Sequence, residues 1–391
     1  MSGLPQLPFD RADLLAVSPE FGELRAAEPV TRVRTETGDE AWLVTGYEEI
    51  RQVFADDRFG RSHPTPESAP RISNNALIGG PSGEYATERQ VHEAMRRLLA
   101  PAFSARRMRA LGGRMQVLVD ELLDEMAEQG PPADLHERLS VPLPIMVICE
   151  LLGVPYGDRE KFRAIAEEMT NLSDPERSAD AQRQMSEYTY AIVQEKREHP
   201  GEDVYSDLAT AALEESDIAR VAGGLLFAGH ETTVNQIDYG VLLLLRSPAQ
   251  RDALRADPSL AAAAVEEIMR MAVPSQHGLV RYAHEDVKVG GVVIRAGELV
   301  MLAVHAANRD GRVYEEPELF DIAREISHPH VGFGYAAHYC LGAGLARVEL
   351  RTVFGSLFQR FPALRLAVPE TDLTPRKDRL TGGFTALPVT W

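Results

Sequence analysis

Cys340 is the side chain with the clearest chemical potential in this 391-residue chain, and it is one of only two cysteines. A stretch rich in glycine and aromatic residues precedes it, and residues 341–358 favour a long helix. The sequence therefore predicts that Cys340 lies in a loop just before a helix N-terminus. At that position the helix dipole and the free backbone N–H groups favour a thiolate.

The glycines near Cys340 indicate what such a thiolate could bind. Gly334, Gly342 and Gly344 let the backbone come close to something flat. A single thiolate with N–H donors around its sulfur suits the iron of a haem. The alternative is that Cys340 is a small apolar core residue, which is the usual role of a free cysteine.

The segment resembles the haem-binding signature of the bacterial soluble cytochrome P-450 family. That signature reads Phe, two residues, Gly, one residue, Arg or His, one residue, Cys, one residue, Gly. Phe333, His338, Cys340 and Gly342 match it, and Ala336 stands where the family has a glycine. If this position needs a left-handed backbone, alanine costs about 1–2 kcal/mol there. We expect Cys340 to remain the ligand despite this departure.

A second candidate site lies within residues 217–246, a long and mostly apolar stretch that favours a central helix. A carboxyl group and hydroxyls in its middle are costly to bury without a purpose. Gly229 there permits a local kink or widening. The stretch resembles the oxygen-binding notch of the family, in which Glu231 and Thr232 would deliver protons to the distal oxygen. Alternatively, Thr232 only bonds back to a helix carbonyl.

Basic side chains elsewhere resemble the residues that contact the haem propionates in this family. His92 and Arg96 are four residues apart in a predicted helix at 88–99, so they share one face. Arg281 and His338 resemble two further propionate partners. On its own, the spacing of His92 and Arg96 is typical of a solvated helix surface.

Glu267 and Arg270 form another pattern, with two residues between them in a predicted helix at 261–271. Such a pair is common and usually means an ordinary surface ion pair. In the family it is a buried structural pair that a downstream basic residue joins, and Arg324 is the candidate for that residue.

The resemblance also implies a substrate pocket, lined by the loop at 61–87, the segment 276–280 and the side chains Phe227, Ala228, Leu279 and Phe384. Small, apolar and uncharged residues dominate there, which suits a sizeable lipophilic molecule. Relatives with these motifs often modify polyketides or terpenoids, so a secondary metabolite such as a macrolide is the expected substrate class.

The bulk composition limits the other functional classes. The chain has 41 basic and 59 acidic residues, a formal net charge of −18, which argues against general nucleic-acid binding. Two cysteines give no disulfide framework, and the N-terminus has no basic segment followed by an apolar run. No apolar run is long enough to cross a bilayer. We therefore expect a cytoplasmic protein with no membrane segment.

The resemblance implies a mainly α fold with small β-sheets, in one triangular domain spanning residues 1–391. Its N-terminal part, about 1–60, would be richer in β-structure, and the helical haem-binding core would span about 88–391. Hairpins are predicted at 30–45, around Gly38-Asp39, and at 287–294. A terminal hairpin is predicted at 382–389, with its tip in the substrate pocket.

The implied activity is that of a haem b monooxygenase, a monomer that inserts one oxygen atom from O2 into a C–H or C=C bond. Thiolate donation favours the O–O cleavage that this requires. No flavin or nicotinamide fingerprint is present, so NAD(P)H electrons would arrive through separate partners, a ferredoxin and its reductase. The basic residues Arg97, Arg106, Arg107 and Arg109 are candidates for docking them. The alternatives are a terpenoid hydroxylase, a peroxide-using haem enzyme, and a non-catalytic haem sensor.

Overall fold

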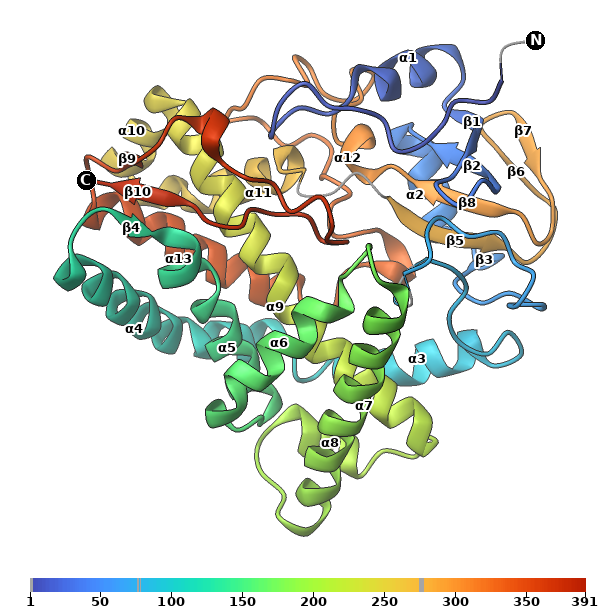
Figure 1. Cartoon of the computed structure of the whole chain (residues 1–391), viewed down its shortest axis with the longest axis horizontal. Helices are drawn as coiled ribbons and strands as arrows, with labels where there is room; N and C mark the ends of the chain where they lie inside the picture. Colours follow the sequence, from blue (N-terminus) through green and yellow to red (C-terminus); the bar gives the residue numbers. More distant parts are fainter. Residues whose placement is uncertain (1–2, 76, 78, 274–277) are drawn as a thin grey trace.

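The computed structural model describes residues 3–75, 77, 79–273 and 278–391. Figure 1 shows a roughly triangular molecule in which helices predominate and the larger sheet, containing β1, β2, β5 and β8, occupies one corner. The helix α8 lies at another corner. The expected class, mainly α with small sheets, is confirmed.

The helices alternate with short loops along most of the described chain. They are α1 (Pro19–Ala27), α2 (Tyr47–Ala55), α3 (Glu88–Leu99), α4 (Ala105–Gln129), α5 (Pro142–Leu152), α6 (Arg159–Met169), α7 (Pro175–Glu198), α8 (Val204–Ala209), α9 (Glu215–Arg246), α10 (Pro248–Ala256), α11 (Ala261–Met271), α12 (Val304–Ala307) and α13 (Ala343–Arg360). The helices predicted at 88–99 and 261–271 have these bounds in the structure.

The strands are short, and they form three sheets. They are β1 (Val30–Arg34), β2 (Glu40–Val44), β3 (Phe59–Gly60), β4 (Ala133–Asp134), β5 (Leu279–Ala283), β6 (Val287–Val289), β7 (Val292–Ile294), β8 (Leu299–Leu302), β9 (Arg365–Leu366) and β10 (Pro388–Thr390). The sheet orders are β1-β2-β8-β5-β3, β4-β10-β9 and β6-β7.

Both predicted internal hairpins are present. β1 pairs antiparallel with β2, and Gly38 between them has φ +87°, a left-handed conformation that glycine adopts without steric cost. β6 pairs antiparallel with β7. β2 also pairs in parallel with β8, with Trp42 opposite Val300, and this joins the N-terminal hairpin to the second half of the chain.

The helix α9 runs through the middle of the helical core, and it packs against α5, α7, α11 and α13. It is α-helical without interruption from Glu215 to Arg246, so the local widening that Gly229 could permit is not formed. Instead, a Cβ added at Gly229 would lie 2.5 Å from Cδ1 of Ile148. Gly229 therefore allows the close packing of α9 against α5.

The terminal hairpin predicted at 382–389 is wrong in its bounds. β10, at the end of this stretch, pairs with β4 and β9, which are distant in sequence. A hairpin forms earlier, where Pro375 pairs with Phe384 and the N–H of Arg376 donates to the carbonyl of Gly383 at 2.9 Å. We call residues 374–385 the C-terminal hairpin. Its tip lies beside the α6–α7 turn, because the N–H of Leu380 donates to the carbonyl of Thr170 at 2.8 Å.

The loop at 61–87 contains no helix or strand among its described residues. Asn75, only 1% exposed, fixes it to the α6–α7 turn. Its amide nitrogen donates to the carbonyl of Met169 at 3.2 Å, the carbonyl of Asn171 at 3.0 Å and the hydroxyl of Ser178 at 2.9 Å. The long loop is therefore held by specific contacts.

Candidate active site

Cys340 lies in the predicted place, between a short 3-10 turn at Ala336–His338 and the start of α13. Its N–H donates to the carbonyl of Phe333 at 2.7 Å, which closes the loop. Gly334 has φ +72°, and a Cβ there would lie 2.5 Å from the carbonyl oxygen of His338. Only glycine fits this tight loop without rearrangement.

Ala336 has φ +50°, so the left-handed conformation that we considered for this position is present. Among the described residues, one other non-glycine residue, Glu316, has positive φ. The loop thus keeps its conformation although alanine replaces the usual glycine, and it carries the steric cost of a left-handed alanine.

The surroundings of Cys340 act on its thiol in opposite directions. Solvent reaches the side chain, yet the protein packed around the sulfur removes enough water to raise the pKa of the thiol. The backbone N–H groups of Gly342 and Ala343 donate to the sulfur and lower this pKa, as do the charges of Arg96 and Arg347. These donors and charges suit a sulfur that bears negative charge.

Arg347, on α13, supports the cysteine loop from behind. Its guanidinium donates to Glu266 from Nε at 2.6 Å and from Nη2 at 2.9 Å, and to the hydroxyl of Tyr339 at 2.8 Å. It also lies over the Phe333 ring, 4.6 Å from the centroid. The bonds from Arg347 and His330 lower the pKa of Glu266 to about 2, against the opposing effect of burial. The sequence analysis did not identify Glu266 or Arg347 as site residues.

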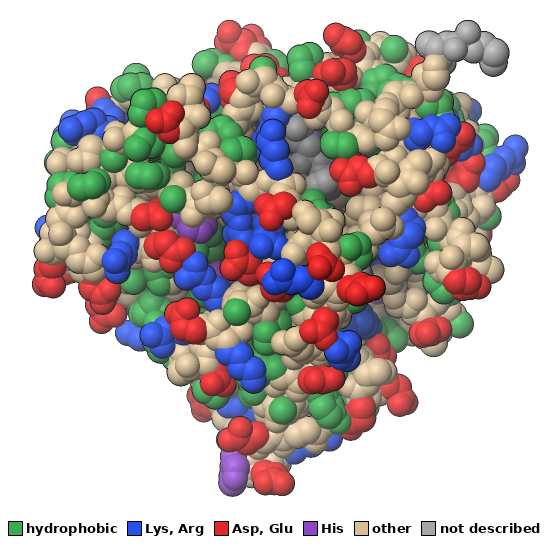
Figure 2. Space-filling model, viewed as in Figure 1, with side chains coloured by type: hydrophobic (Ala, Val, Ile, Leu, Met, Phe, Trp, Pro, Cys, Tyr) green, Lys and Arg blue, Asp and Glu red, His purple; other side chains and the backbone are tan. Residues whose placement is uncertain are grey.

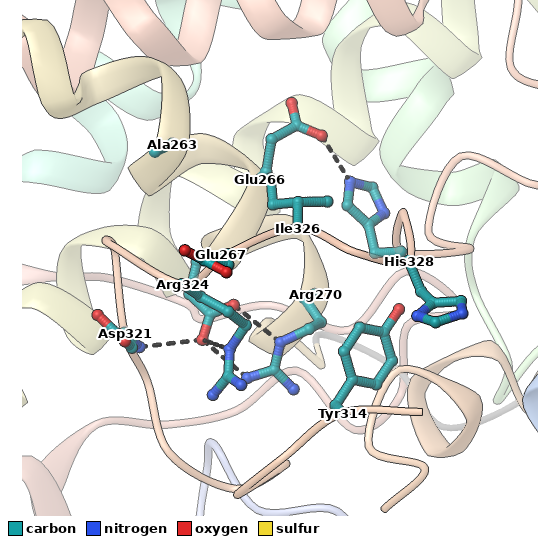
Figure 3. A pocket seen from close by; sticks show the side chains of 11 residues that line it. Ala263, Glu266, Glu267, Arg270, Tyr314, Asp321, Arg324, Ile326 and His328 are labelled. Carbon is teal, nitrogen blue, oxygen red and sulfur yellow. Dashed lines mark hydrogen bonds and ion pairs between the residues drawn. The ribbon is translucent and has the colours of Figure 1, made fainter. Parts of the chain in front are cut away.

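Glu267, Arg270 and Arg324 form the buried cluster that was predicted (Figure 3). Arg270 donates to Glu267 from Nη2 at 2.7 Å and from Nε at 2.8 Å. Arg324 donates to the same carboxylate from Nε at 3.3 Å. The remaining N–H groups of Arg270 donate to the carbonyls of Asn308, Pro317 and Leu319. The cluster therefore anchors the segment that leads towards Cys340.

The predicted propionate partners lie together as two imidazole and two guanidinium groups. The rings of His92 and His338 have centroids 5.0 Å apart, and Arg96 donates to the carbonyl of Tyr339 at 2.7 Å. Burial, with the charges of Arg281 and His92, lowers the pKa of His338 to about 4. Burial also lowers the pKa of Arg281 to about 10, and its Nε has no acceptor among the described residues.

Among the described residues, few negative groups balance the guanidinium group of Arg281. Glu88 is the carboxylate that acts on Arg281, and its oxygens already accept from the N–H groups of Arg61 and Ser62. Arg61, which the sequence analysis did not single out, adds a further buried cation whose Nε lacks an acceptor among the described residues. Buried cations without matching carboxylates call for an anion. The two propionates of a haem beside Cys340 fit this need.

Glu231 and Thr232 are both on α9, but they have different surroundings. The hydroxyl of Thr232 is exposed and donates to the carbonyl of Ala228 at 2.8 Å, which is the helix back-bond considered as an alternative. Glu231 is only 6% exposed, and burial raises the pKa of its carboxyl group. Its Oε2 accepts from the hydroxyl of Thr381 at 3.1 Å.

The predicted pocket residues separate into two groups. Phe227 is half-buried, and Ala228 and Leu279 are exposed, so these three remain candidates for contact with a substrate. Phe384 is fully buried and stacks on Tyr239 with the ring centroids 4.8 Å apart. It borders a different, polar cavity, so it stays outside the candidate substrate site. Of the segment 276–280, residues 276 and 277 lie outside the described residues.

Within the described ranges, no three His, Cys, Asp or Glu side chains are grouped so that they could hold a metal ion. None of the helices in the described part of the chain is long and apolar enough to span a membrane.

Comparisons with known proteins agree with this geometry. A family model described as Cytochrome P450 matches residues 172–388. The chain is 45% identical over 401 residues to pentalenolactone synthase of Streptomyces exfoliatus, with 100% of both chains covered. It is 40% identical to mycinamicin IV hydroxylase/epoxidase of Micromonospora griseorubida, with 98% of each covered. The solved structure of the putative thioether synthase SgvP matches with a TM-score of 0.92 and 40% identity, covering 100% of both chains.

Proposed function

The chain belongs to the cytochrome P450 family, and we propose from its site that it is a haem-thiolate monooxygenase acting on a lipophilic secondary metabolite. The observation that carries this proposal is the position of Cys340. Its sulfur accepts two backbone N–H groups at the start of α13, and the nearby His338 is under the charge of Arg281, a buried guanidinium whose Nε has no acceptor among the described residues. This combination suits a thiolate ligand and a dianionic cofactor.

In this proposal, each part of the site has one task. Cys340 holds the haem iron, with Gly342 donating to its sulfur, and His92, Arg96, Arg281 and His338 bind the propionates through charge-assisted hydrogen bonds. When bound, the haem supplies the activation of O2, which electron donation from the thiolate favours. Glu267, Arg270 and Arg324 keep the cysteine loop in place.

Glu231 and Thr232 handle protons in the proposed reaction. Reduction of one oxygen atom to water consumes two protons, and these must cross the apolar interior around α9. Glu231 is buried, and burial raises the pKa of its carboxyl group, so the protonated form is more favoured there than in water. Thr232 offers a hydroxyl to the distal side, where α9 has exposed residues.

The names of the relatives support a secondary metabolite as substrate. They include a pentalenolactone synthase, a pentalenic acid synthase and a mycinamicin hydroxylase/epoxidase. A solved relative, with a TM-score of 0.88 and 40% identity, is bound to filipin I. We therefore propose a polyketide or macrolide substrate, with a terpenoid as the alternative that the 45% identical relative favours.

The electrons come from partner proteins in this proposal. Arg97, Arg106 and Arg109 are exposed, while Arg107 is tied to the carbonyl of Glu202 at 2.8 Å. Met108, between two of these arginines, lies 3.2 Å from the position of a Cβ at Gly344, at the start of α13. The exposed arginines therefore lie near the helix that follows Cys340, where they could attract an acidic ferredoxin. The enzyme acts as a monomer in this proposal.

The test compares the wild-type chain with Cys340→Ala. The reduced wild-type protein with carbon monoxide should show the strongly red-shifted Soret band of a thiolate-ligated haem, and Cys340→Ala should lose it. With NAD(P)H, ferredoxin and its reductase under ¹⁸O2, the product should contain one labelled oxygen atom. An unchanged spectrum in Cys340→Ala would refute the ligand assignment. Turnover with hydrogen peroxide alone would favour the peroxide-using alternative, and a normal spectrum without turnover of any polyketide or terpenoid would favour a sensor.

A further inference from the structure

A polar cavity lies beside the buried carboxyl group of Glu231. It is lined by residues of α9, α6, residues 136–141 and the C-terminal hairpin, is partly open to solvent, and offers about 130 Å³ to water. A single water needs about 10–15 Å³ by this measure, so the cavity has room for several. We call it the rear cavity. Its polar lining distinguishes it from the apolar pocket expected for the substrate.

The rear cavity contains polar atoms that need partners. His230 is 2% exposed, and neither of its ring nitrogens has a hydrogen-bond partner among the described residues. Burial lowers the pKa of its imidazole to about 3, so the ring is neutral at pH 7. Buried polar groups of this kind are normally satisfied by ordered water. The lining therefore indicates a cavity filled with water.

Two ion pairs stand between the rear cavity and the solvent. Arg376 donates to Glu167 at 2.8 Å, and Arg163 donates to Glu137 at 3.0 Å. The two carboxylate side chains are 43% and 41% exposed, respectively. Figure 2 shows acidic and basic side chains mixed over α6, α7 and the C-terminal hairpin. Water can therefore reach the cavity past charged groups that are themselves hydrated.

The C-terminal hairpin is attached to α9 at this cavity. The amide nitrogen of Asn235 donates to the carbonyl of Thr381 at 3.0 Å. Gly383 has φ +97°, and a Cβ there would lie 2.2 Å from Oδ1 of Asn235, so a side chain would prevent this approach. The attachment places the hydroxyl of Thr381 3.1 Å from Oε2 of Glu231, to which it donates.

Because of this hydrogen bond, the side chains of Glu231 and Thr232 lie in different surroundings. Consecutive residues of an α-helix project about 100° apart. Glu231 borders the rear cavity, whereas the hydroxyl of Thr232 is exposed and bonds within the helix. The carboxyl group of Glu231 therefore faces the water of the rear cavity as long as Thr381 holds it.

We propose that Thr381 is a positioning residue for Glu231, which it holds in the rear cavity where water can supply a proton to the carboxyl group. The inference rests on the proposed monooxygenase function, and it adds that Glu231 receives its proton from the rear cavity. A proton from the bulk solvent is relayed along the cavity water to a Glu231 carboxylate oxygen; each water in the relay gives up one proton and takes up another, so no hydroxide remains. In this proposal Thr381 acts only through Glu231.

The test replaces Thr381 with Val, which keeps the shape and removes the donor, and with Ser, which keeps the donor. Thr385→Val is the matched control, because Thr385 borders the same cavity but its hydroxyl bonds, among the described residues, only to the carbonyl of Thr374. Product and hydrogen peroxide are measured against NAD(P)H consumed. Thr381→Val should raise the ratio of peroxide to product on the order of tenfold, the worth of one hydrogen bond to a charged group. Thr381→Ser and Thr385→Val should stay near the wild type.

A second readout does not depend on turnover. The infrared C=O stretch of the protonated Glu231 carboxyl group is identified by its loss in Glu231→Gln. Loss of the Thr381 donor favours the protonated form, so this band should grow in Thr381→Val at fixed pH and remain unchanged in Thr385→Val. If Thr381→Val does not retain haem, Thr381→Ala removes the same hydroxyl and replaces it in both measurements.

The outcomes separate the inference from the proposed function. If Glu231→Gln raises peroxide release and Thr381→Val changes neither the peroxide ratio nor the infrared band, the role of Thr381 is wrong. If Glu231→Gln also leaves the peroxide ratio unchanged, the proton role of Glu231 in the proposed function is wrong, and the inference falls with it.

Discussion

Arg270 and Glu267 meet one turn apart on α11, with two hydrogen bonds of 2.7 and 2.8 Å, and their side chains are only 3% and 4% exposed. Removing either partner leaves the other charge buried without its counter-ion. Glu267→Ala or Arg270→Ala should therefore cost roughly 3–5 kcal/mol. The measurement is the yield of haem-loaded protein and its unfolding midpoint in denaturant.

An exposed pair on α3 supplies the control. Arg89 donates to Glu93 at 3.0 Å, and the two side chains are 69% and 53% exposed. Arg89→Ala should change the stability by less than about 0.5 kcal/mol, because solvent screens such pairs. Equal effects of Arg89→Ala and Arg270→Ala would show that the buried cluster is not structural.

Ala336 is the position where a stabilising change is expected. Its left-handed backbone costs about 1–2 kcal/mol for alanine, whereas Gly adds about 0.4–1 kcal/mol of unfolded-state entropy. Ala336→Gly should therefore raise the free energy of unfolding by roughly 0.5–1 kcal/mol. The control is Ala337→Gly, at a neighbouring position without positive φ, which should destabilise by a similar amount. A loss of stability in Ala336→Gly would mean that the loop does not strain the alanine.

The lowered pKa of Glu266 predicts that the free energy of unfolding depends on pH. This pKa is lowered to about 2 in the folded protein from 4.5, mainly by hydrogen bonds from Arg347 and His330 that outweigh burial. A depressed carboxyl pKa stabilises the fold above the unfolded value, and this contribution is lost as pH falls from about 4.5 towards 2. The full contribution is at most about 3 kcal/mol.

The test compares the unfolding free energy of the wild type with that of Glu266→Gln between pH 7 and pH 3.5. The wild type should be the more stable at pH 7, and the difference should shrink below pH 4.5. A difference that stays constant over this range would show that the pKa of Glu266 is not lowered in the folded state.

Removal of the Thr232 hydroxyl should reduce the coupling of NAD(P)H consumption to product formation without weakening the binding of haem or substrate. This hydroxyl bonds to the carbonyl of Ala228, so removing it leaves the helix intact. Thr232→Ala should retain haem content and substrate affinity, form less product per NAD(P)H and release more hydrogen peroxide. Thr232→Ser should restore the coupling. If Thr232→Ala couples as well as the wild type, the hydroxyl serves the helix alone.

If the exposed arginines dock the ferredoxin, the rate of electron transfer from ferredoxin to this protein should depend on salt. Arg97, Arg106 and Arg109 stand out in a protein of net charge −18. Reversing two of them to Glu should slow reduction by an acidic ferredoxin at low salt, and the difference should diminish as salt screens the charges. The control for net charge is the double variant Arg177→Glu with Arg183→Glu, both exposed on α7, which changes the charge by the same amount. Rates that match the wild type throughout a salt series would exclude this surface.

The sequence predicted those parts of the site that depend on local order. The bounds of α3 and α11 and the loop before α13 follow from periodicity and short motifs. The burial of Glu267 and Arg270, and the addition of Arg324 to them, came from the family resemblance. The left-handed conformation of Ala336 was considered only as a condition, and it is present in the structure.

Contacts between distant segments were not predictable in this way. The pairing of Arg347 with Glu266, the approach of Thr381 to Glu231 and the stacking of Phe384 on Tyr239 join residues that no local pattern relates. The same is true of β10, whose partners β4 and β9 lie in separate parts of the chain. Such contacts are decided by tertiary packing, so periodicity cannot specify them.

The strand partners also determine when this chain can fold during its synthesis. Trp42 of β2 bonds to Glu298, 256 residues later, and Asp134 of β4 bonds to Leu387, 253 residues later. At about 5–20 residues per second, the nascent strands β2 and β4 wait roughly 10–50 s for these partners. During that time their backbone edges are open to other chains. Slower translation, lower temperature or added chaperones should therefore raise the yield of folded recombinant protein, because they protect strands whose partners are synthesised late.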